Sequence, residues 1–340
     1  MIGTEFLKGQ GLGNQLFCYI SARCIAKDLG CEFGTAGQEQ LAVNIHSKKG
    51  MYFMDMDLGS PIVNVDDFHI YKEAEERLYL KNCVHDMVYG CYVAGSDEKL
   101  YHIKDNTLIY GNLQAQRYFL AHKEDIKQWL RVKEEYDSYE FTRDNLCIMN
   151  VRGGEYVDNR SLFLRRSYWL NAMKHMKSIR SDMEFMIVTD DLEAAGRLLP
   201  GIPAYHFDLA GDYVTIKNAK YLVLSNSTFA FFPAFTSETA MKIIAPKYWA
   251  RHNVSDGYWA SEQNIYEEFM YLDRKGKLFT AEECREELEE YKRRRWTLMR
   301  TVKYEDSAVR RQAGKDKFLY WWDKVRNKIY RIHKAEIAKD

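Results

Sequence analysis

The sequence predicts an α/β fold in which two Rossmann-like halves face one another across a cleft. Two short polar motifs support this prediction: Gly11-Leu12-Gly13-Asn14-Gln15, and Asn150-Val151-Arg152-Gly153-Gly154-Glu155-Tyr156. Each motif directly follows an apolar run, so each is expected at the end of a strand. Open α/β sheets bind ligands in a crevice at the carboxyl ends of their strands. Two such motifs, about 140 residues apart, therefore indicate two sheets with one site between them.

The first half is expected to begin with a strand over residues 2–7, a loop around Gly11 and Gly13, and a helix over residues 14–29. Gly30 suits the C-terminal cap of that helix. Its apolar residues approximate a 3.6-residue period, at Leu16, Phe17, Ile20, Ile25 and Leu29. A helix that begins directly after a strand gathers backbone N–H groups at one place, which suits a phosphate or a polar sugar. A tight turn without a ligand is the alternative.

The pattern is less regular between this helix and residue 145. This region contains aromatic stretches such as residues 109–114, and we expect a charged surface helix over residues 122–136 and a polar linker over residues 133–143. The first domain is therefore placed at residues 1–140.

From residue 146 onward, apolar runs and helix-length segments alternate regularly. The predicted strands cover residues 146–149, 185–188, 204–207, 221–224 and 242–245. The predicted helices cover residues 167–179, 192–199 and 212–220, and a further one follows Thr228. Strands this apolar indicate a parallel sheet that is covered on both faces. We place a second domain at residues 146–272 and a helical tail at residues 273–340.

Composition excludes several classes of protein. With 340 residues, of which 46% are hydrophobic and 29% charged, the chain is globular and long enough for two domains. Its formal net charge is zero, which argues against a nucleic-acid partner held by bulk electrostatics.

Cysteine usage and the N-terminus point to a cytoplasmic protein. The seven cysteines are odd in number and scattered, and no CxxC pair occurs, so reduced thiols are expected instead of disulfides or a zinc site. The first residues, Met1 to Leu7, are too short and too polar for a signal peptide or a membrane anchor.

Two further motifs follow the first pair in order: Val188-Thr189-Asp190-Asp191, and Leu224-Ser225-Asn226-Ser227-Thr228-Phe229. Together the four motifs resemble those of the α-1,2-fucosyltransferase family, which typically carries GGLGNQ, HxRRGDY, SDD and NSSFSWW at comparable places. The resemblance covers roughly residues 1–250 and implies a bacterial member with the GT-B fold. It also implies an acceptor-binding first domain and a second domain that binds the nucleotide-sugar donor. The last ninety residues carry no family motif.

Arg152 is the candidate for stabilising the leaving diphosphate, because a guanidinium fork matches phosphate geometry. The resemblance implies the same role, since Arg152 matches the first arginine of HxRRGDY. Three neighbours depart from the family pattern: Asn150 replaces the histidine, Gly153 the second arginine and Glu155 the aspartate. A structural salt bridge is the alternative for Arg152. No catalytic base is obvious from the sequence. Glu155 is the nearest carboxylate by motif, and a structural role is the alternative for it.

The nucleotide is expected to contact Asp212, Ser227 and Thr228. In related GDP-fucose enzymes an aspartate sixteen residues before a Ser/Thr pair binds the guanine edge, and Asp212 stands sixteen residues before Thr228. The two hydroxyl residues occupy a strand-to-helix turn, where N–H groups converge on an anion-sized spot. Helix N-capping is the alternative for Asp212 and for Thr228.

Asp190 and Asp191 end an apolar strand, where they would orient the sugar or cap the following helix. Asp55-Met56-Asp57 is a DxD pattern of the kind that holds Mn²⁺ or Mg²⁺ in GT-A glycosyltransferases. Its place between two Rossmann-like motifs does not suit that fold, so no metal and no other cofactor is expected.

The C-terminal segment, residues 315–337, has a basic amphipathic pattern. Apolar residues recur at spacings of four and three, at Phe318, Trp322, Val325, Ile329 and Ile332, among several lysines and arginines. Such a helix suits an anionic membrane surface, here the inner membrane, and an enzyme with a lipid-linked acceptor. The more ordinary interpretation is a helix that docks on the protein's own body or on a second subunit, and the membrane surface is the alternative to it.

The resemblance, together with these candidate residues, implies an inverting, metal-independent transferase that moves L-fucose from GDP-fucose to a glycan hydroxyl, in α-1,2 linkage. Asn14 and the loop with Gly11 and Gly13 would border the sugar and the acceptor. Two alternatives remain open: a binding protein that has lost catalysis, suggested by Asn150 and Gly153, and a transferase that uses another GDP-sugar. The acceptor, the oligomeric state and the base are not fixed by the sequence.

Overall fold

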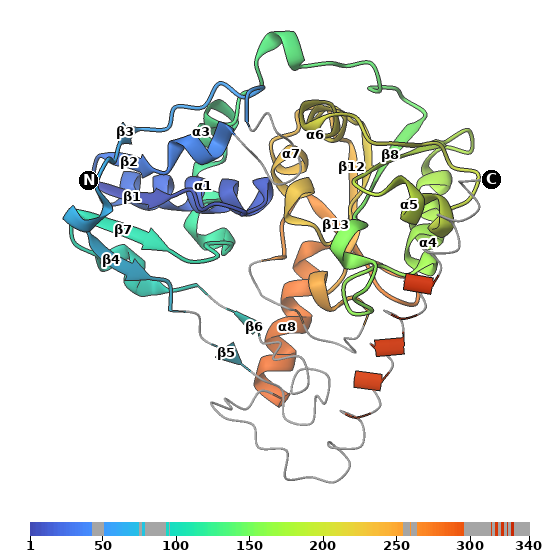
Figure 1. Ribbon diagram of the computed structural model, residues 1–340. Helices are drawn as coiled ribbons and strands as arrows, with labels where there is room; N and C mark the ends of the chain where they lie inside the picture. Colours follow the sequence, from blue (N-terminus) through green and yellow to red (C-terminus); the bar gives the residue numbers. More distant parts are fainter. Residues whose placement is uncertain are drawn as a thin grey trace.

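A computed structural model describes residues 1–42, 51–74, 77–78, 93–94, 96–253, 259 and 264–295, and single positions 314, 317, 318, 321, 322, 325, 328 and 329. It contains two separate sheets of mainly parallel strands, each packed against helices (Figure 1). The predicted α/β fold with two Rossmann-like halves is therefore confirmed. Strands of the first sheet lie between residues 2 and 110, and those of the second between residues 146 and 279. The exact domain boundaries stay a prediction.

The first sheet has the strand order β3-β2-β1-β7-β4, and all its neighbours are parallel. Its strands are β1 (Ile2–Glu5), β2 (Phe33–Ala36), β3 (Ser60–Pro61), β4 (His69–Lys72) and β7 (Thr107–Tyr110). The chain runs outward from β1 to β3 and later returns on the other side of β1. The carboxyl end of β1 thus lies at a topological switch point, where open α/β sheets bind ligands. A separate antiparallel pair joins β5 (Arg77–Leu78) to β6 (Val93–Ala94).

The second sheet has the order β10-β9-β8-β11-β12-β13-β14, in which only the edge strand β14 is antiparallel. Its strands are β8 (Leu146–Val151), β9 (Glu184–Thr189), β10 (Ala204–Tyr205), β11 (Tyr221–Val223), β12 (Lys242–Pro246), β13 (Phe269–Leu272) and β14 (Leu278–Phe279). The order reverses between β8 and β11, so this sheet also has a switch point. The complete burial of β8 agrees with a strand that is covered on both faces.

The α-helices whose bounds the structure describes are α1 (Leu12–Asp28), α3 (Lys123–Trp129), α4 (Arg166–Ile179), α5 (Leu192–Leu198), α6 (Leu209–Lys217), α7 (Phe231–Phe235) and α8 (Ala281–Arg295). The helix expected over residues 122–136 is shorter than predicted. It ends at Trp129 because the chain then turns to form a β-bridge between Val132 and Met54. The helix expected over residues 212–220 begins earlier, at Leu209, because the Asp208 side chain caps it.

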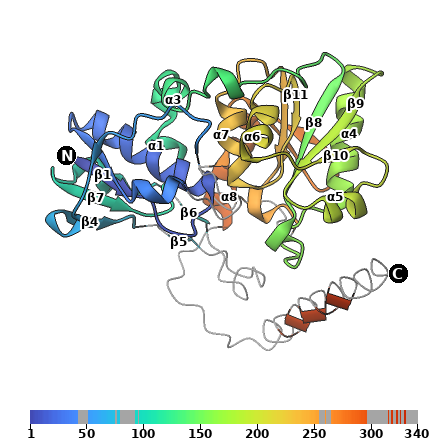
Figure 2. The same ribbon diagram turned by 45° about the horizontal axis from the view of Figure 1, so that its top comes forward.

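The two halves share one hydrophobic core. Helix α1 is buried on nearly all sides, because it packs both on β1 of its own sheet and on α7 of the second half. In both views α7 lies between the two sheets (Figure 1, Figure 2). This two-sided burial explains why apolar residues of α1 spread beyond a single stripe.

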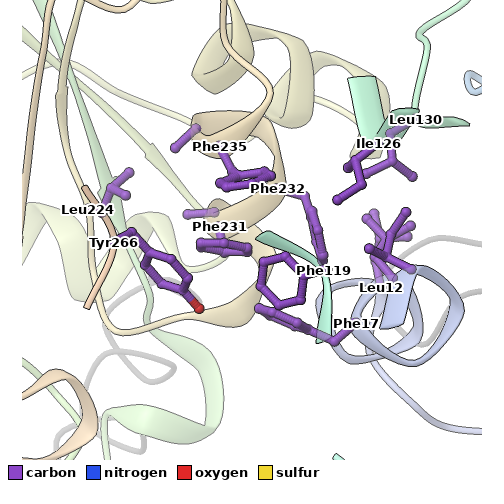
Figure 3. Packing of buried hydrophobic residues seen from close by; sticks show 14 of the residues in the cluster. Leu12, Phe17, Phe119, Ile126, Leu130, Leu224, Phe231, Phe232, Phe235 and Tyr266 are labelled. Atoms are coloured by element: carbon purple, nitrogen blue, oxygen red, sulfur yellow. The ribbon is translucent and has the colours of Figure 1, made fainter. Parts of the chain in front are cut away.

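Aromatic rings form the centre of this shared core (Figure 3). The ring of Phe17, on α1, lies 5.0 Å from that of Phe231 and 4.7 Å from that of Phe232, both on α7. Phe119 lies 5.8 Å from Phe235 in an edge-to-face contact. Each such pair is worth about 0.5–1.5 kcal/mol beyond its buried area, so the contact between the halves is tight.

The helical tail predicted over residues 273–340 does not begin at residue 273, because β14 (Leu278–Phe279) still belongs to the second sheet, and the rest of the tail is described only in part. Helix α8 is present, and the single described positions between 314 and 329 are helical, while the remaining residues of the tail lie outside the described part. The cysteines that the structure describes, Cys18, Cys24, Cys31, Cys147 and Cys284, are not in disulfides. Cys83 and Cys91 lie outside the described residues. None of the described helices is long and apolar enough to cross a membrane.

Candidate active site

A pocket of about 440 Å³ lies where the two switch points meet. The loop before α1 forms one wall, and the residues that follow β8, β9, β10 and β11 form the other. The predicted GT-B arrangement, two Rossmann-like halves with a site between them, is thus confirmed. All ten residues that the sequence predicts for the site line this pocket: Gly11, Gly13, Asn14, Asn150, Arg152, Glu155, Asp190, Asp212, Ser227 and Thr228. Their roles stay predictions.

Arg152 is held by two carboxylates. Its Nη2 donates to both carboxylate oxygens of Glu155, at 2.7 and 2.8 Å, and its Nη1 lies 2.5 Å from Asp190 Oδ2. The N–H of Gly153 donates to the other oxygen of Asp190 at 2.7 Å, which fixes that carboxylate. The Arg152 side chain is 13% exposed, Asp190 19% and Glu155 65%. An incoming anion would therefore displace Glu155 more readily than Asp190.

Two glycines shape the turn behind Arg152. A Cβ on Gly153 would lie 2.4 Å from the Cβ of Asp191, and Gly154 has a positive φ of 48°. Asp191 itself is fixed, because its side chain accepts the N–H of Ala194 and caps α5 at 2.9 Å, which confirms the capping role expected for it. The structure thus leaves no room at position 153 for the arginine of the family pattern.

Asn150 and Ser225 join neighbouring strands beneath the pocket. Asn150 is 5% exposed, and its Oδ1 accepts a hydrogen bond from the Ser225 hydroxyl at 2.9 Å. Such a contact between the ends of β8 and β11 stabilises the switch point. Because the Asn150 side chain is buried and makes this hydrogen bond, it can contact a ligand less than an exposed side chain would.

Asp212 lies in the first turn of α6 and is 6% exposed. Its oxygens accept from His206 Nδ1 at 2.8 Å and from the Phe207 N–H at 2.9 Å. The capping alternative for Asp212 is wrong, because Asp208 caps the helix by accepting the N–H of Gly211. Burial raises the pKa of the Asp212 carboxyl to about 6, against the lowering effects of the Phe207 N–H and of His206.

The remaining predicted residues come from the two facing turns. Ser227 caps the short 3₁₀ turn Thr228–Ala230, since its hydroxyl accepts the N–H of Phe229 at 3.3 Å, so the capping alternative proposed for Thr228 is wrong. Across the pocket, Asn14 Oδ1 accepts from Gln114 Nε2 at 3.2 Å. Gly13 packs directly on the backbone of Thr228, where a Cβ would lie 2.4 Å from the carbonyl carbon.

The DxD pattern lies elsewhere. Asp57 pairs with Arg23 at 2.8 Å and also accepts the N–H of Gly59, while Asp55 pairs with Arg131. Neither aspartate lines the pocket. Within the part of the chain that the structure describes, no group of three or more His, Cys, Asp and Glu side chains is placed to hold a metal ion.

His206 and its neighbours Phe207 and Asp208 line the pocket, and the sequence analysis did not identify them. These three residues directly follow β10, just as Arg152 directly follows β8 and Asp190 directly follows β9. That position after a strand is the signal that could have identified them. The strand predicted over residues 204–207 is shorter than expected, because β10 covers only Ala204 and Tyr205, so His206 and Phe207 lie after the strand instead of inside it.

The comparisons with known proteins agree with a sugar transferase. No protein-family model matches the chain. An α-1,2-colitosyltransferase of Escherichia coli is 27% identical over 169 residues, which cover 43% of this chain and 57% of the relative. The chain has a glycosyltransferase relative. The match spans little more than half of that relative's length, and the relative's name agrees with the resemblance that the motifs indicate.

Solved structures of similar fold are more distant. NodZ α-1,6-fucosyltransferase soaked with GDP-fucose has a TM-score of 0.40 at 10% identity, covering 82% of this chain and 98% of that chain. POFUT1 in complex with GDP-fucose also has a TM-score of 0.40, at 9% identity, covering 72% of this chain and 97% of that chain.

Proposed function

We propose that this protein is a glycosyltransferase that moves a 6-deoxy sugar, L-fucose, from GDP-fucose to a hydroxyl of a glycan, forming an α-1,2 linkage. One observation carries the proposal. Motifs that are far apart in the sequence line a single pocket, at the switch points of two facing, mainly parallel sheets. The pocket offers a guanidinium for a diphosphate, a buried carboxylate for a base edge, and a glycine loop for the sugar.

Arg152 would stabilise the charge that develops on the β-phosphate of the leaving GDP. The diphosphate and Glu155 would compete for the same Nη2, so donor binding would release the exposed Glu155 carboxylate from Arg152. In the transfer step the acceptor oxygen bonds to C1 of the sugar as the bond from C1 to the β-phosphate oxygen breaks. The acceptor proton passes to Glu155, GDP leaves, and the configuration at C1 inverts.

Nucleotide choice would rest on Asp212. A carboxylate can accept from the two adjacent N–H groups of guanine, and the contacts from His206 and Phe207 fix its orientation in the pocket. Ser227 and Thr228 would add hydroxyl and backbone N–H groups near the phosphates. The acceptor would approach from the side of Asn14.

A ligand panel followed by turnover tests this proposal. GDP should raise the melting temperature and UDP should not, because a ligand that binds only the folded state stabilises it. Transfer from GDP-fucose, followed as GDP release, should then continue in excess EDTA, since Arg152 and N–H groups would take the place of a metal. Equal stabilisation by both nucleotides would refute the guanine assignment, and activity restored by Mn²⁺ would refute the metal-independent mechanism.

A second candidate is the same reaction with another GDP-linked sugar. The curated relative is named for transfer of colitose, which favours that sugar as the alternative donor. Parallel assays with GDP-fucose and GDP-colitose decide between them by the ratio of kcat/KM. A protein that binds GDP-fucose but turns over neither donor would be the catalytically impaired homologue that Asn150 and Gly153 suggest.

A further inference from the structure

The described positions of the C-terminal tail expose an unusual amount of aromatic surface. Phe318, Trp321, Trp322 and Ile329 are helical and have exposed fractions of 59%, 57%, 50% and 62%. Phe318 lies 6.4 Å from each of the two tryptophan rings. Figure 2 shows the described pieces of this helix in red, standing clear of both sheets. Docking on the described body of the protein, the more ordinary interpretation of the sequence, therefore does not account for these side chains.

These side chains share one face of the helix. At about 100° per residue, positions 318, 321, 322, 325 and 329 fall within roughly 100° of arc. We call Phe318, Trp321, Trp322, Val325 and Ile329 the aromatic stripe. Lys317 and Lys328 are described and exposed, and they lie along one edge of the stripe. A long lysine side chain at such an edge can keep its ammonium at a polar surface while the stripe is buried.

The charge pattern distinguishes between two partners that could bury the aromatic stripe, a second copy of the chain and an anionic surface. The sequence from 315 to 334 holds seven lysines and arginines, Lys315, Lys317, Lys324, Arg326, Lys328, Arg331 and Lys334, against two aspartates. In a coiled coil with a second copy, the positions that flank the seam would include Arg326 and Lys328 and no acid, so like charges would face one another. An anionic surface instead complements these charges.

The aromatic composition favours a lipid surface. Tryptophan is enriched at the membrane–water interface, where an amphipathic ring can sit at the level of the headgroups. An amphipathic helix with basic residues on its polar side and Trp and Phe on the other lies in the plane of that interface.

We propose that the aromatic stripe and its lysines bind the surface of a membrane that contains anionic lipids, with the helix lying in the interface. The proposal is independent of the proposed function, because it requires neither donor nor acceptor. It would place the active site next to a membrane surface.

Co-sedimentation of the full 340-residue chain with vesicles tests this proposal. The protein should sediment with vesicles rich in phosphatidylglycerol, weakly with phosphatidylcholine alone, and less in high salt. Trp321→Ala/Trp322→Ala should reduce the partition coefficient roughly tenfold or more, because the apolar anchor is lost. Lys317→Glu/Lys328→Glu should reduce it by a similar factor.

A matched control removes exposed apolar side chains from the body. Tyr139 and Leu170 are 55% and 44% exposed, and Tyr139→Ala/Leu170→Ala should sediment like the wild type. Equal melting temperatures would show that all variants are folded. A wild type that stays in the supernatant would overturn the proposal, as would a tryptophan variant that binds vesicles normally. Light scattering that shows a dimer dissociated by Trp321→Ala/Trp322→Ala would also overturn it, in favour of a second copy.

Discussion

Arg152 is the residue proposed to stabilise the leaving diphosphate, and its two carboxylate partners define how a diphosphate would reach it. Two carboxylates already compensate its positive charge, one fixed by a backbone N–H and one exposed to solvent. A diphosphate can replace the exposed carboxylate without disturbing the fixed one. Asp190 therefore orients the guanidinium, and Glu155 occupies the edge that a substrate would take.

Removal of the guanidinium should reduce catalysis more than stability. We expect Arg152→Ala to lower kcat roughly 10²-fold or more, the scale of losing one preorganised donor in a transition state. Arg152→Lys should not rescue it, because a point charge does not reproduce the planar fork. GDP release with a glycan acceptor measures the rate, and melting temperature monitors the fold. A folded Arg152→Ala protein with near wild-type turnover would refute the mechanism.

Glu155→Gln should separate binding from turnover. The neutral amide competes less with a diphosphate for Arg152, so the Kd for GDP-fucose should fall. A general base typically contributes 10²- to 10⁴-fold, so kcat should fall by about that factor. Calorimetric titration and single-turnover assays measure the two effects. If donor affinity and kcat both stay unchanged, Glu155 is neither a competitor nor a base.

Asp212 should make the stability of the protein depend on pH, and the direction of that dependence can be tested. Its folded pKa, about 6, lies above the ordinary value of 3.8 for an aspartate, so the folded state holds this proton more tightly. Its contribution to stability is thus full below pH 3.8 and is lost as pH rises through about 6, at roughly 1.4 kcal/mol per pH unit. Asp212→Asn should therefore be more stable than the wild type at neutral pH and equal to it in acid, as measured by denaturant unfolding. The same variant should bind GDP less well. Greater stability of the wild type at neutral pH would contradict this account.

At the scale of elements, the site is a set of strand ends. The ends of β1, β8, β9 and β11 were predictable, because each apolar run is followed by a polar motif, and the predicted residues there line the pocket except Asp191, which caps α5. The pairing of Arg152 with Glu155 was not predictable, because it depends on the 3₁₀ turn Gly154–Tyr156 that brings position 155 back over position 152. His206 was missed because the strand predicted over residues 204–207 ends at Tyr205, so that His206 follows the strand instead of lying inside it.

The close contact between α1 and the turn at Thr228 should require glycine at position 13, because a Cβ there would collide with the backbone of the turn. Gly13→Ala would place a Cβ within 2.4 Å of the Thr228 backbone, which cannot rotate away. We expect a loss of about 1–3 kcal/mol in unfolding free energy, the usual cost of overpacking, with weaker GDP binding. Gly11→Ala is the matched control, since nothing lies within 4 Å of its added Cβ, and its stability should stay close to wild type. Equal stability of the two variants would show that the first turn of α1 is not fixed by Thr228.

For the whole molecule, the shared aromatic core decides how the halves behave together. Two Rossmann-like halves joined by a small polar contact would unfold independently and move relative to one another. Here Phe231 is fully buried among rings from both halves, Phe17 and Phe119 from the first and Phe235 and Tyr266 from the second. The halves are therefore expected to behave as one cooperative unit, with little hinge motion between them.

Calorimetry tests this coupling. The wild type should unfold in a single transition, and GDP should raise the temperature of that whole transition. The reason is that the two walls of the pocket, one from each half, belong to the same cooperative unit. Phe231→Ala should cost about 3–5 kcal/mol by leaving a cavity in the shared core, and should lower the melting temperature or split the transition. Trp169→Ala, in the separate core on the far face of the second sheet, should cost a comparable amount without separating the halves. Two wild-type transitions, of which GDP shifts only one, would show instead that the halves fold and move independently, and that the pocket between them closes by domain motion.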